Sequence, residues 1–169
     1  MRHVILPLLR VASLLASLTA GAAFGATQTA TVNATANKPL ILAKLQDLDL
    51  GTVTLGPGIW SNAAVSLSRA GAFTCGSANL TCTGATSVAQ YNVQGSKQQP
   101  ITISAPNVAL VNQSDPTQTL LLTVDSPATI VLANSGFPGS NFSIGGSVTL
   151  NSTTSGGTYV GTFNVTVDY

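Results

Sequence analysis

The sequence predicts an all-β protein with the architecture of a sandwich or a barrel, and three observations support this prediction. Apolar and polar residues alternate with period two in almost every segment after residue 26. The alternating segments are rich in Val, Ile, Thr and Leu, and turns of Gly, Pro, Asp and Ser separate them at short intervals. No window of the sequence combines helical spacing with helix caps. The predicted strands are 29–36, 39–45, 47–55, 63–68, 86–94, 100–104, 107–111, 119–125, 128–133, 141–150 and 158–168.

Residues 1–26 have the pattern of a cleavable secretory signal peptide. Arg2 gives a basic start, an apolar stretch follows, and small residues form the exit. Pro7 and Arg10 interrupt the apolar stretch, which is shorter than the roughly 20 residues that a membrane-spanning helix needs. We therefore expect export, with cleavage between residues 22 and 26.

The remainder is long enough for one domain, which we place at 39–169, with an N-terminal extension at 27–38. The chain has six Lys or Arg and five Asp or Glu, and two of the basic residues lie in the signal segment, which leaves a net charge near −1. So few charges exclude the basic patch of a nucleic-acid-binding protein. They also exclude a polybasic lipid-binding surface.

Cys75 and Cys82 both lie in the exported part, with six residues between them. In an oxidising compartment two such cysteines most simply form one disulfide. The segment 76–79 between them suits the tip of a hairpin that the disulfide staples. Zinc binding is the alternative, but two thiols lack the further ligands that a closed zinc site requires.

A change of parity occurs in the predicted strand 47–55. Leu48 and Leu50 share one face, whereas Val53 and Leu55 have the opposite parity. A continuous strand would need a bulge near Gly51 and Thr52, because a shift of one residue exchanges the two faces of a strand. Two strands that meet at a glycine bend explain the pattern equally well.

The residues for ordinary side-chain catalysis are missing from the sequence after the signal segment. The single histidine is His3, which excludes a Ser-His or Cys-His pair and a histidine metal site in the processed chain. Asp47 and Asp49 form the only close acidic pair, about 6.5–7 Å apart on a strand. Calcium requires six to eight oxygens, so a solvated strand face is the simpler interpretation of this pair. We expect no enzyme activity, no metal and no cofactor.

Five aromatic residues allow two interpretations. They are able to line a sugar-binding surface, or they pack in the core and in hairpins, as aromatic residues of small β-domains commonly do. They are Trp60, Phe73, Tyr91, Phe137 and Phe142.

The C-terminal strand alternates strictly. One face carries Tyr159, Gly161, Phe163, Val165, Val167 and Tyr169. The other face is mainly Thr, Asn and Asp. This pattern predicts a strand with one side in the core, and it leaves open what covers the edge of that strand.

The N-terminal segment 29–36 has a complementary pattern. Its apolar residues, Ala30, Val32, Ala34 and Ala36, occupy the even positions. Only Val32 is larger than alanine, so this strand would fold poorly alone. A short alternating strand at a free terminus suits addition to the sheet edge of another molecule, where main-chain hydrogen bonds supply affinity.

These segments resemble parts of bacterial pilins, in particular fimbrial subunits of the chaperone–usher type. Gly-Gly-Thr-Tyr-Val-Gly-Thr-Phe-Asn-Val-Thr-Val-Asp-Tyr at 156–169 is similar to the closing strand of that family. Thr-Ala-Thr-Val-Asn-Ala-Thr-Ala at 29–36 is similar to its donor strand. Leu-Asp-Leu-Gly-Thr-Val at 48–53 resembles an early-strand motif of small secreted pilin-like domains.

The resemblance implies an immunoglobulin-like β-sandwich that lacks one strand. It implies a structural subunit of a surface fibre, with identical or related subunits, a periplasmic chaperone and an outer-membrane usher as partners. Residues 29–36 would be the donor strand and residues 159–169 the acceptor side. The protein would pass through the periplasm to the cell surface. The alternative is a stand-alone secreted binding or adhesive module, for example one that binds a glycan, in which residues 29–36 pair within their own sheet.

Overall fold

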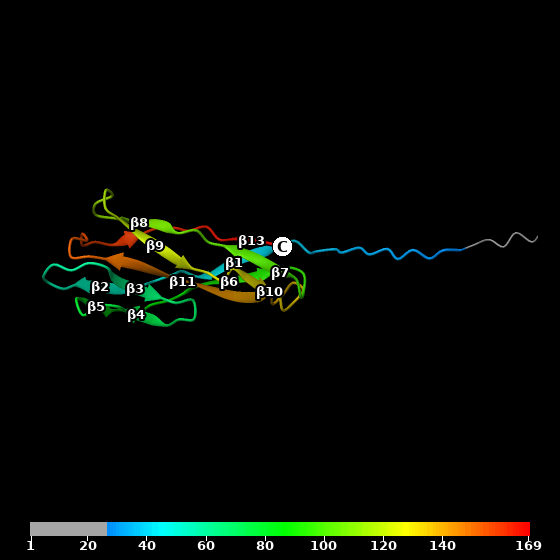
Figure 1. Ribbon diagram of the computed structural model, residues 1–169, viewed down its shortest axis with the longest axis horizontal. Helices are drawn as coiled ribbons and strands as arrows, with labels where there is room; N and C mark the ends of the chain where they lie inside the picture. Colours follow the sequence, from blue (N-terminus) through cyan, green and yellow to red (C-terminus); the bar gives the residue numbers. More distant parts are fainter. Residues whose placement is uncertain (1–26) are drawn as a thin grey trace, which may run out of the picture. The chain divides into compact units, whose positions relative to one another are not determined.

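The computed structural model describes residues 27–169, and every regular element in that range is a β-strand (Figure 1). The all-β prediction is therefore confirmed. Residues 1–26, and with them the predicted signal peptide, lie outside the described residues. Thr35–Tyr169 forms one compact unit, and the residues before it belong to a separate unit.

The strands follow one another in the chain with short connections. They are β1 (Ile41–Gln46), β2 (Thr52–Leu55), β3 (Ala63–Leu67), β4 (Phe73–Cys75), β5 (Leu80–Thr83), β6 (Ala89–Gln94), β7 (Pro100–Ser104), β8 (Val108–Asn112), β9 (Thr119–Asp125), β10 (Thr129–Val131), β11 (Ser140–Leu150), β12 (Tyr159–Val160) and β13 (Thr166–Asp168).

All pairs of named strands are antiparallel, and they form three sheets that pack as a β-sandwich. An eight-stranded sheet has the order β1-β6-β11-β9-β8-β12, with β3 and β4 attached through β11. A three-stranded sheet has the order β10-β7-β13, and β2 pairs with β5 in a third, two-stranded sheet. Alternate residues are buried along β3, β6 and β7, as the period-two pattern predicts.

Strand β11 holds the large sheet together. Its first half pairs with β6, and its second half pairs with β9 and β3. Gly145 and Gly146 lie where these partners change. A Cβ atom at Gly145 would overlap the carbonyl oxygen of Leu67, so the close approach of β3 requires glycine at that position.

The core has two hydrophobic clusters. The first joins β6 and β11 of the large sheet to β7 of the three-stranded sheet, and consists of Ala89, Tyr91, Val93, Ile101, Ile103, Leu132, Phe142 and Ile144. The second lies beneath the two-stranded sheet and consists of Ala63, Val65, Leu80, Leu122, Val148 and Leu150.

The aromatic residues do not form a common surface. The rings of Tyr91 and Phe142 stack in the first cluster with their centroids 5.4 Å apart, and burial raises the pKa of Tyr91. Trp60 packs against the second cluster and donates from Nε1 to the carbonyl oxygen of Gly56 at 3.1 Å. Phe73 lies on β4 at the edge of the large sheet, and Phe137 projects from a loop.

The change of parity near Gly51 marks a change of sheet. Asp49 pairs with Ser87 as an isolated bridge, Gly51 has a φ of 76°, and β2 begins at Thr52 in the two-stranded sheet. Of the two explanations of the sequence pattern, the glycine bend is the one observed. The predicted strand 47–55 is accordingly reduced to β2.

The disulfide between Cys75 and Cys82 is confirmed, with a Cα–Cα distance of 6.2 Å. The expectation of a stapled hairpin is wrong. Cys75 ends β4, which pairs with β3 in the large sheet, whereas Cys82 lies on β5, which pairs with β2. The disulfide therefore links two sheets rather than two strands of one hairpin.

Two other predicted strands differ from the structure. Residues 27–40 contain no strand, so the segment 29–36 is not a strand within this chain. The strand predicted at 158–168 is divided into β12 and β13, with 161–165 outside any strand. The division arises because β12 pairs with β8 and β13 pairs with β7, which belong to different sheets. Between them Gly161 crosses closely over Leu110, since a Cβ at Gly161 would lie 2.8 Å from Leu110 Cδ2.

Candidate strand-pairing edge

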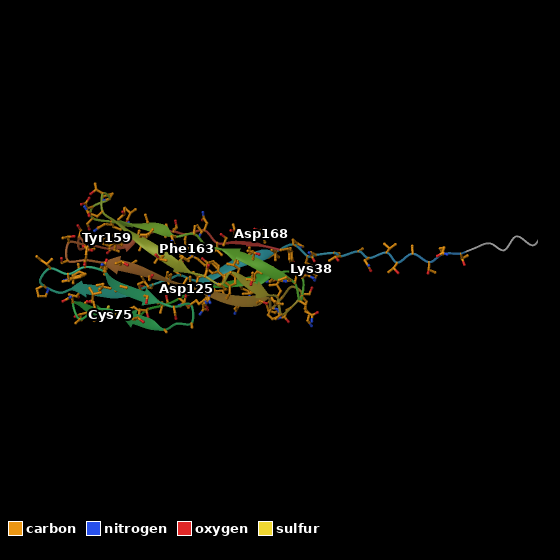
Figure 2. The ribbon with its side chains drawn as sticks, in the orientation of Figure 1. Lys38, Cys75, Asp125, Tyr159, Phe163 and Asp168 are labelled. Atoms are coloured by element: carbon orange, nitrogen blue, oxygen red, sulfur yellow. A yellow bond between two sulfur atoms is a disulfide. The ribbon has the colours of Figure 1, made fainter. Side chains whose placement is uncertain are left out.

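Residues 158–169, here called the C-terminal edge, contain two strands that each have a strand neighbour on one side only, and residues 161–165 between them belong to no strand. β12 pairs with β8 and β13 pairs with β7, and each is the last strand of its sheet. Figure 2 shows Tyr159 at one end of the sandwich, Phe163 in the middle and Asp168 at the other end, so the edge follows the length of the domain. An edge of this kind presents main-chain N–H and C=O groups that a further strand is able to pair with.

The alternation predicted for the C-terminal edge is present. Tyr159, Phe163, Val165 and Val167 are all partly buried, and the residues between them are exposed. Phe163 packs against both core clusters, while Val165 and Val167 pack against the first. None of the four is fully buried, so the apolar face of this strand is only partly covered.

Two of the predicted acceptor residues have other roles. Gly161 is exposed and provides the close crossing over Leu110. Tyr169 is exposed over 45% of its surface, and its ring does not join the row of partly buried side chains. Its hydroxyl group instead fixes the start of the domain to its end.

This connection, here called the terminal clip, involves Tyr169, Lys38 and Ser96. The Tyr169 hydroxyl donates to the carbonyl oxygen of Lys38 at 2.6 Å and accepts from the amide of Ser96 at 2.8 Å. The amide of Lys38 donates to Ser96 Oγ at 2.7 Å. Both main-chain groups of Lys38 are thus bonded, and Lys38 lies beside the end of the C-terminal edge (Figure 2).

Strand β1, which follows the clip, is a second edge that sequence reasoning missed. It pairs only with β6, and its Leu42 packs against the same core cluster as Val165 and Val167. The signal for it was present in the alternation of Leu40 and Leu42. Lys44 carries the exposed charge of this strand: it donates to Asp47 at 2.7 Å, and this hydrogen bond and charge raise the pKa of Lys44.

The predicted donor residues Ala30, Val32, Ala34 and Ala36 are all exposed and belong to no strand. Val32 has 87% of its surface exposed.

The acidic residues act in local structure. Asp47 pairs with Lys44, whereas Asp49 Oδ1 accepts from the amide of Gly51 at 2.8 Å. Asp115 Oδ1 accepts from the amide and the hydroxyl of Thr117, and these bonds lower the pKa of Asp115. Over residues 27–169 no group of three His, Cys, Asp or Glu side chains has the arrangement of a metal site.

Within the same described range, no helix is long and apolar enough to cross a membrane. A surface depression of about 320 Å³ lies beside Tyr159 and is lined mainly by hydroxyl and amide side chains. Several of their polar atoms are already bonded: Asn151 Oδ1 accepts from Thr153 and Thr154, and the Tyr159 hydroxyl donates to the carbonyl oxygen of Ser155.

Comparison with known proteins gives one match. A family model described as a domain of unknown function, DUF4402, matches residues 40–169. No curated protein and no solved structure matches the chain.

Proposed function

The chain belongs to the DUF4402 family, and we propose from its strand edges that it is a structural subunit of a bacterial surface fibre that assembles by strand exchange. In this proposal residues 29–36 of one copy add to the C-terminal edge of the next copy. The observation that carries the proposal is that one chain contains both an open strand edge and an alternating segment that forms no strand within residues 27–169.

The C-terminal edge suits an added strand better than the other edges of the domain. β12 and β13 are as short as β4 and β10, but they lie on one alternating segment that extends over residues 158–169. β2 and β5 are short strands next to the disulfide. β1 carries Lys44 and a register shift between Lys44 and Gln46. A lysine and a bulge are devices that protect sheet edges from unwanted pairing. The C-terminal edge has neither device, and Asp168 is its only charged side chain.

The chemistry of the two segments is complementary. Phe163, Val165 and Val167 leave apolar surface partly uncovered, and Val32 with its three alanines offers small apolar side chains at the matching period of two. Main-chain hydrogen bonds along the edge would provide affinity, and the alternate side chains would fill the spaces between the apolar groups. Burial of apolar surface contributes roughly 25 cal/mol per Å².

The proposal extends to the partners and the location of the protein. Before assembly the same edge would need cover, and a periplasmic chaperone that pairs with it would serve that purpose. Export, passage through an outer-membrane usher and display at the cell surface are part of the same proposal.

Deletion of residues 27–37 from the exported protein tests the proposal. We expect a folded chain that no longer forms fibres, because the added strand is missing while Thr35–Tyr169 is a compact unit. A synthetic peptide of residues 27–37 should then bind the deleted chain, as measured by calorimetry. Sedimentation and electron microscopy should show fibres for the complete processed protein and none for the deleted chain. Fibres of normal length from the deleted chain contradict the proposal.

Two point variants provide a matched pair. Val32→Lys places a charge on the apolar face of the segment, whereas Thr31→Lys places the same charge on the opposite face. We expect Val32→Lys to abolish peptide binding and Thr31→Lys to retain it. Equal losses in both variants would show that the alternation has no role. A processed protein that stays monomeric and binds a glycan would favour the alternative of a stand-alone binding module.

A further inference from the structure

The two ends of the compact unit carry different loops. The end that holds the terminal clip, here called the proximal end, also holds the loop around Phe137. In this loop the amide of Gly136 donates to the carbonyl oxygen of Gly95 at 3.1 Å, next to Ser96. The opposite end, here called the distal end, holds the loops around Ile59 and Ser152. There the amide of Ser152 donates to the carbonyl oxygen of Trp60 at 3.0 Å. The long strand β11 begins at the proximal end and finishes at the distal end (Figure 1).

The three most exposed large apolar side chains of residues 27–169 lie in three different parts of the chain. Ile59 is 102% exposed, Phe137 is 88% exposed and Val32 is 87% exposed, and the next, Val131, is 63% exposed. Single exposed apolar residues are ordinary. Here, however, one lies in the proposed donor segment, one at the proximal end and one at the distal end.

Both loops hold their apolar side chain on a fixed backbone. Trp60 Nε1 donates to Gly56 across the Ile59 loop at 3.1 Å. Gly139 donates from its amide to the carbonyl oxygen of Gly136 across the Phe137 loop at 2.8 Å. A side chain on an ordered loop loses little conformational freedom when it binds, which favours its use in a contact.

The direction of strand addition decides which ends meet. The C-terminal edge runs from the distal end at Tyr159 to the proximal end at Tyr169. The donor segment leaves its own domain at the proximal end, through Lys38. If it adds antiparallel to the C-terminal edge, its last residues lie at the distal end of the acceptor. The proximal end of the donor copy then faces the distal end of the acceptor copy.

Parallel addition would have a different result. The donor copy would emerge at the proximal end of the acceptor, so that two proximal ends would face each other. Such an arrangement closes into a dimer, whereas a head-to-tail contact that does not close generates a filament. A fibre therefore requires the antiparallel direction. The donor segment is the shorter of the two, since residues 29–36 reach about 27 Å and the C-terminal edge extends over about 40 Å, so the segment would cover about two thirds of the edge.

Charge is compatible with this arrangement. The proximal end carries Lys38 and Lys97, with Asp168 on β13 nearby, whereas the distal end carries Asp115.

We propose that in the fibre Phe137 of one copy packs against Ile59 of the copy whose C-terminal edge holds its N-terminal segment. This second contact rests on the proposed function. It would give successive subunits a second point of contact, which would fix the angle between them.

Cross-linking of cysteine variants tests the contact. In the variant that combines Ile59→Cys with Phe137→Cys, a short bis-maleimide should produce a ladder of multimers from assembled material. Each single variant should produce no ladder. Phe137→Cys combined with Ala109→Cys, an exposed position within β8, is the matched control and should also give none. The reagent does not react with the existing disulfide.

Each other outcome overturns a defined part of the inference. If the variant with both Ile59→Cys and Phe137→Cys forms fibres but gives no ladder of cross-linked multimers, the contact is overturned and the strand exchange stays intact. A cross-linked dimer from Phe137→Cys alone indicates two proximal ends in contact, and overturns the head-to-tail direction. A processed protein that stays monomeric overturns the proposed function and the contact together. As a second measurement, Phe137→Ser should shorten the fibres while the affinity of the 27–37 peptide for the deleted chain remains unchanged. If Phe137→Ser reduces both the length of the fibres and the affinity of the peptide, the claim that the two contacts are separate is overturned.

Discussion

The hydroxyl group of Tyr169 donates a hydrogen bond of 2.6 Å to the carbonyl oxygen of Lys38, across a separation of 131 residues. Gly95 makes this possible, because a Cβ at that position would lie 2.6 Å from the Tyr169 oxygen and 2.7 Å from Leu40 Cδ2. The bond fixes the point at which the N-terminal segment leaves the domain.

Tyr169→Phe should weaken this connection. The variant removes the partner of the Ser96 amide and of the Lys38 carbonyl, and we expect a loss of about 0.5–1.5 kcal/mol in the free energy of unfolding. Hydrogen exchange gives the local check. The Ser96 amide should exchange faster, while the Leu132 amide, which donates to Gln99, should be unchanged. Equal protection of Ser96 in both proteins would contradict the role of the clip.

Removal of the disulfide should loosen the two-stranded sheet first. Cys75→Ser with Cys82→Ser should cost about 2–3 kcal/mol, on the basis of the chain entropy of so short a loop. A two-stranded sheet is marginal by itself, so β2 and β5 depend on their attachment to the rest. Amide exchange should rise more in β2 and β5 than in β6 and β11. A uniform rise over all four strands would contradict this interpretation.

Gly145→Ala should destabilise the domain. The added methyl group would overlap the carbonyl oxygen of Leu67, and overpacking of this kind costs about 1–3 kcal/mol. Gly156→Ala is the control, because no atom lies within 4 Å of a Cβ at that position. For this variant we expect no loss in the free energy of unfolding, or a gain of up to about 1 kcal/mol, because alanine lowers the conformational entropy of the unfolded chain. Denaturant unfolding of both variants measures the difference, and similar losses would rule out the close approach of β3 as the cause.

Asp115 should make stability depend on pH. Hydrogen bonds from Thr117 lower the pKa of this carboxyl in the folded chain. The resulting stabilisation is fully present above the ordinary carboxyl pKa, about 4, and is lost as the pH falls through the lower folded-state pKa. Asp115→Asn removes the titration but keeps an acceptor. The stability difference between parent and variant should therefore shrink on acidification, as measured by thermal unfolding at a series of pH values. A difference that is constant with pH would contradict the prediction.

Strand positions followed closely from the sequence where one strand stays in one sheet. The predicted strands 100–104 and 119–125 agree with β7 and β9 to the residue. Predictions failed where the chain changes sheets, at Gly51 and within 161–165, because alternation continues across such a change and does not reveal it. The strands β4 and β5 were missed for a related reason, since their short length gives too few residues to show a period.

The candidate edge was predictable in its residues but not in its surroundings. The alternation of Tyr159, Phe163, Val165 and Val167 is written in the chain itself, because side chains of a strand point to opposite faces in turn. That Tyr169 turns away to bind Lys38, and that β1 is a further edge, depends on contacts between distant segments.

Neighbouring residues alone are enough to predict the all-β class and the inward face of the longer strands, and two cysteines allow a single disulfide. Contacts between distant segments decide that the disulfide joins two sheets, that the C-terminal segment is shared between β8 and β7, and which edges stay open. The physical reason is that strand pairing is a long-range choice. Main-chain hydrogen bonds are nearly the same for every pair of strands, so the packing of the whole core selects which strands become neighbours.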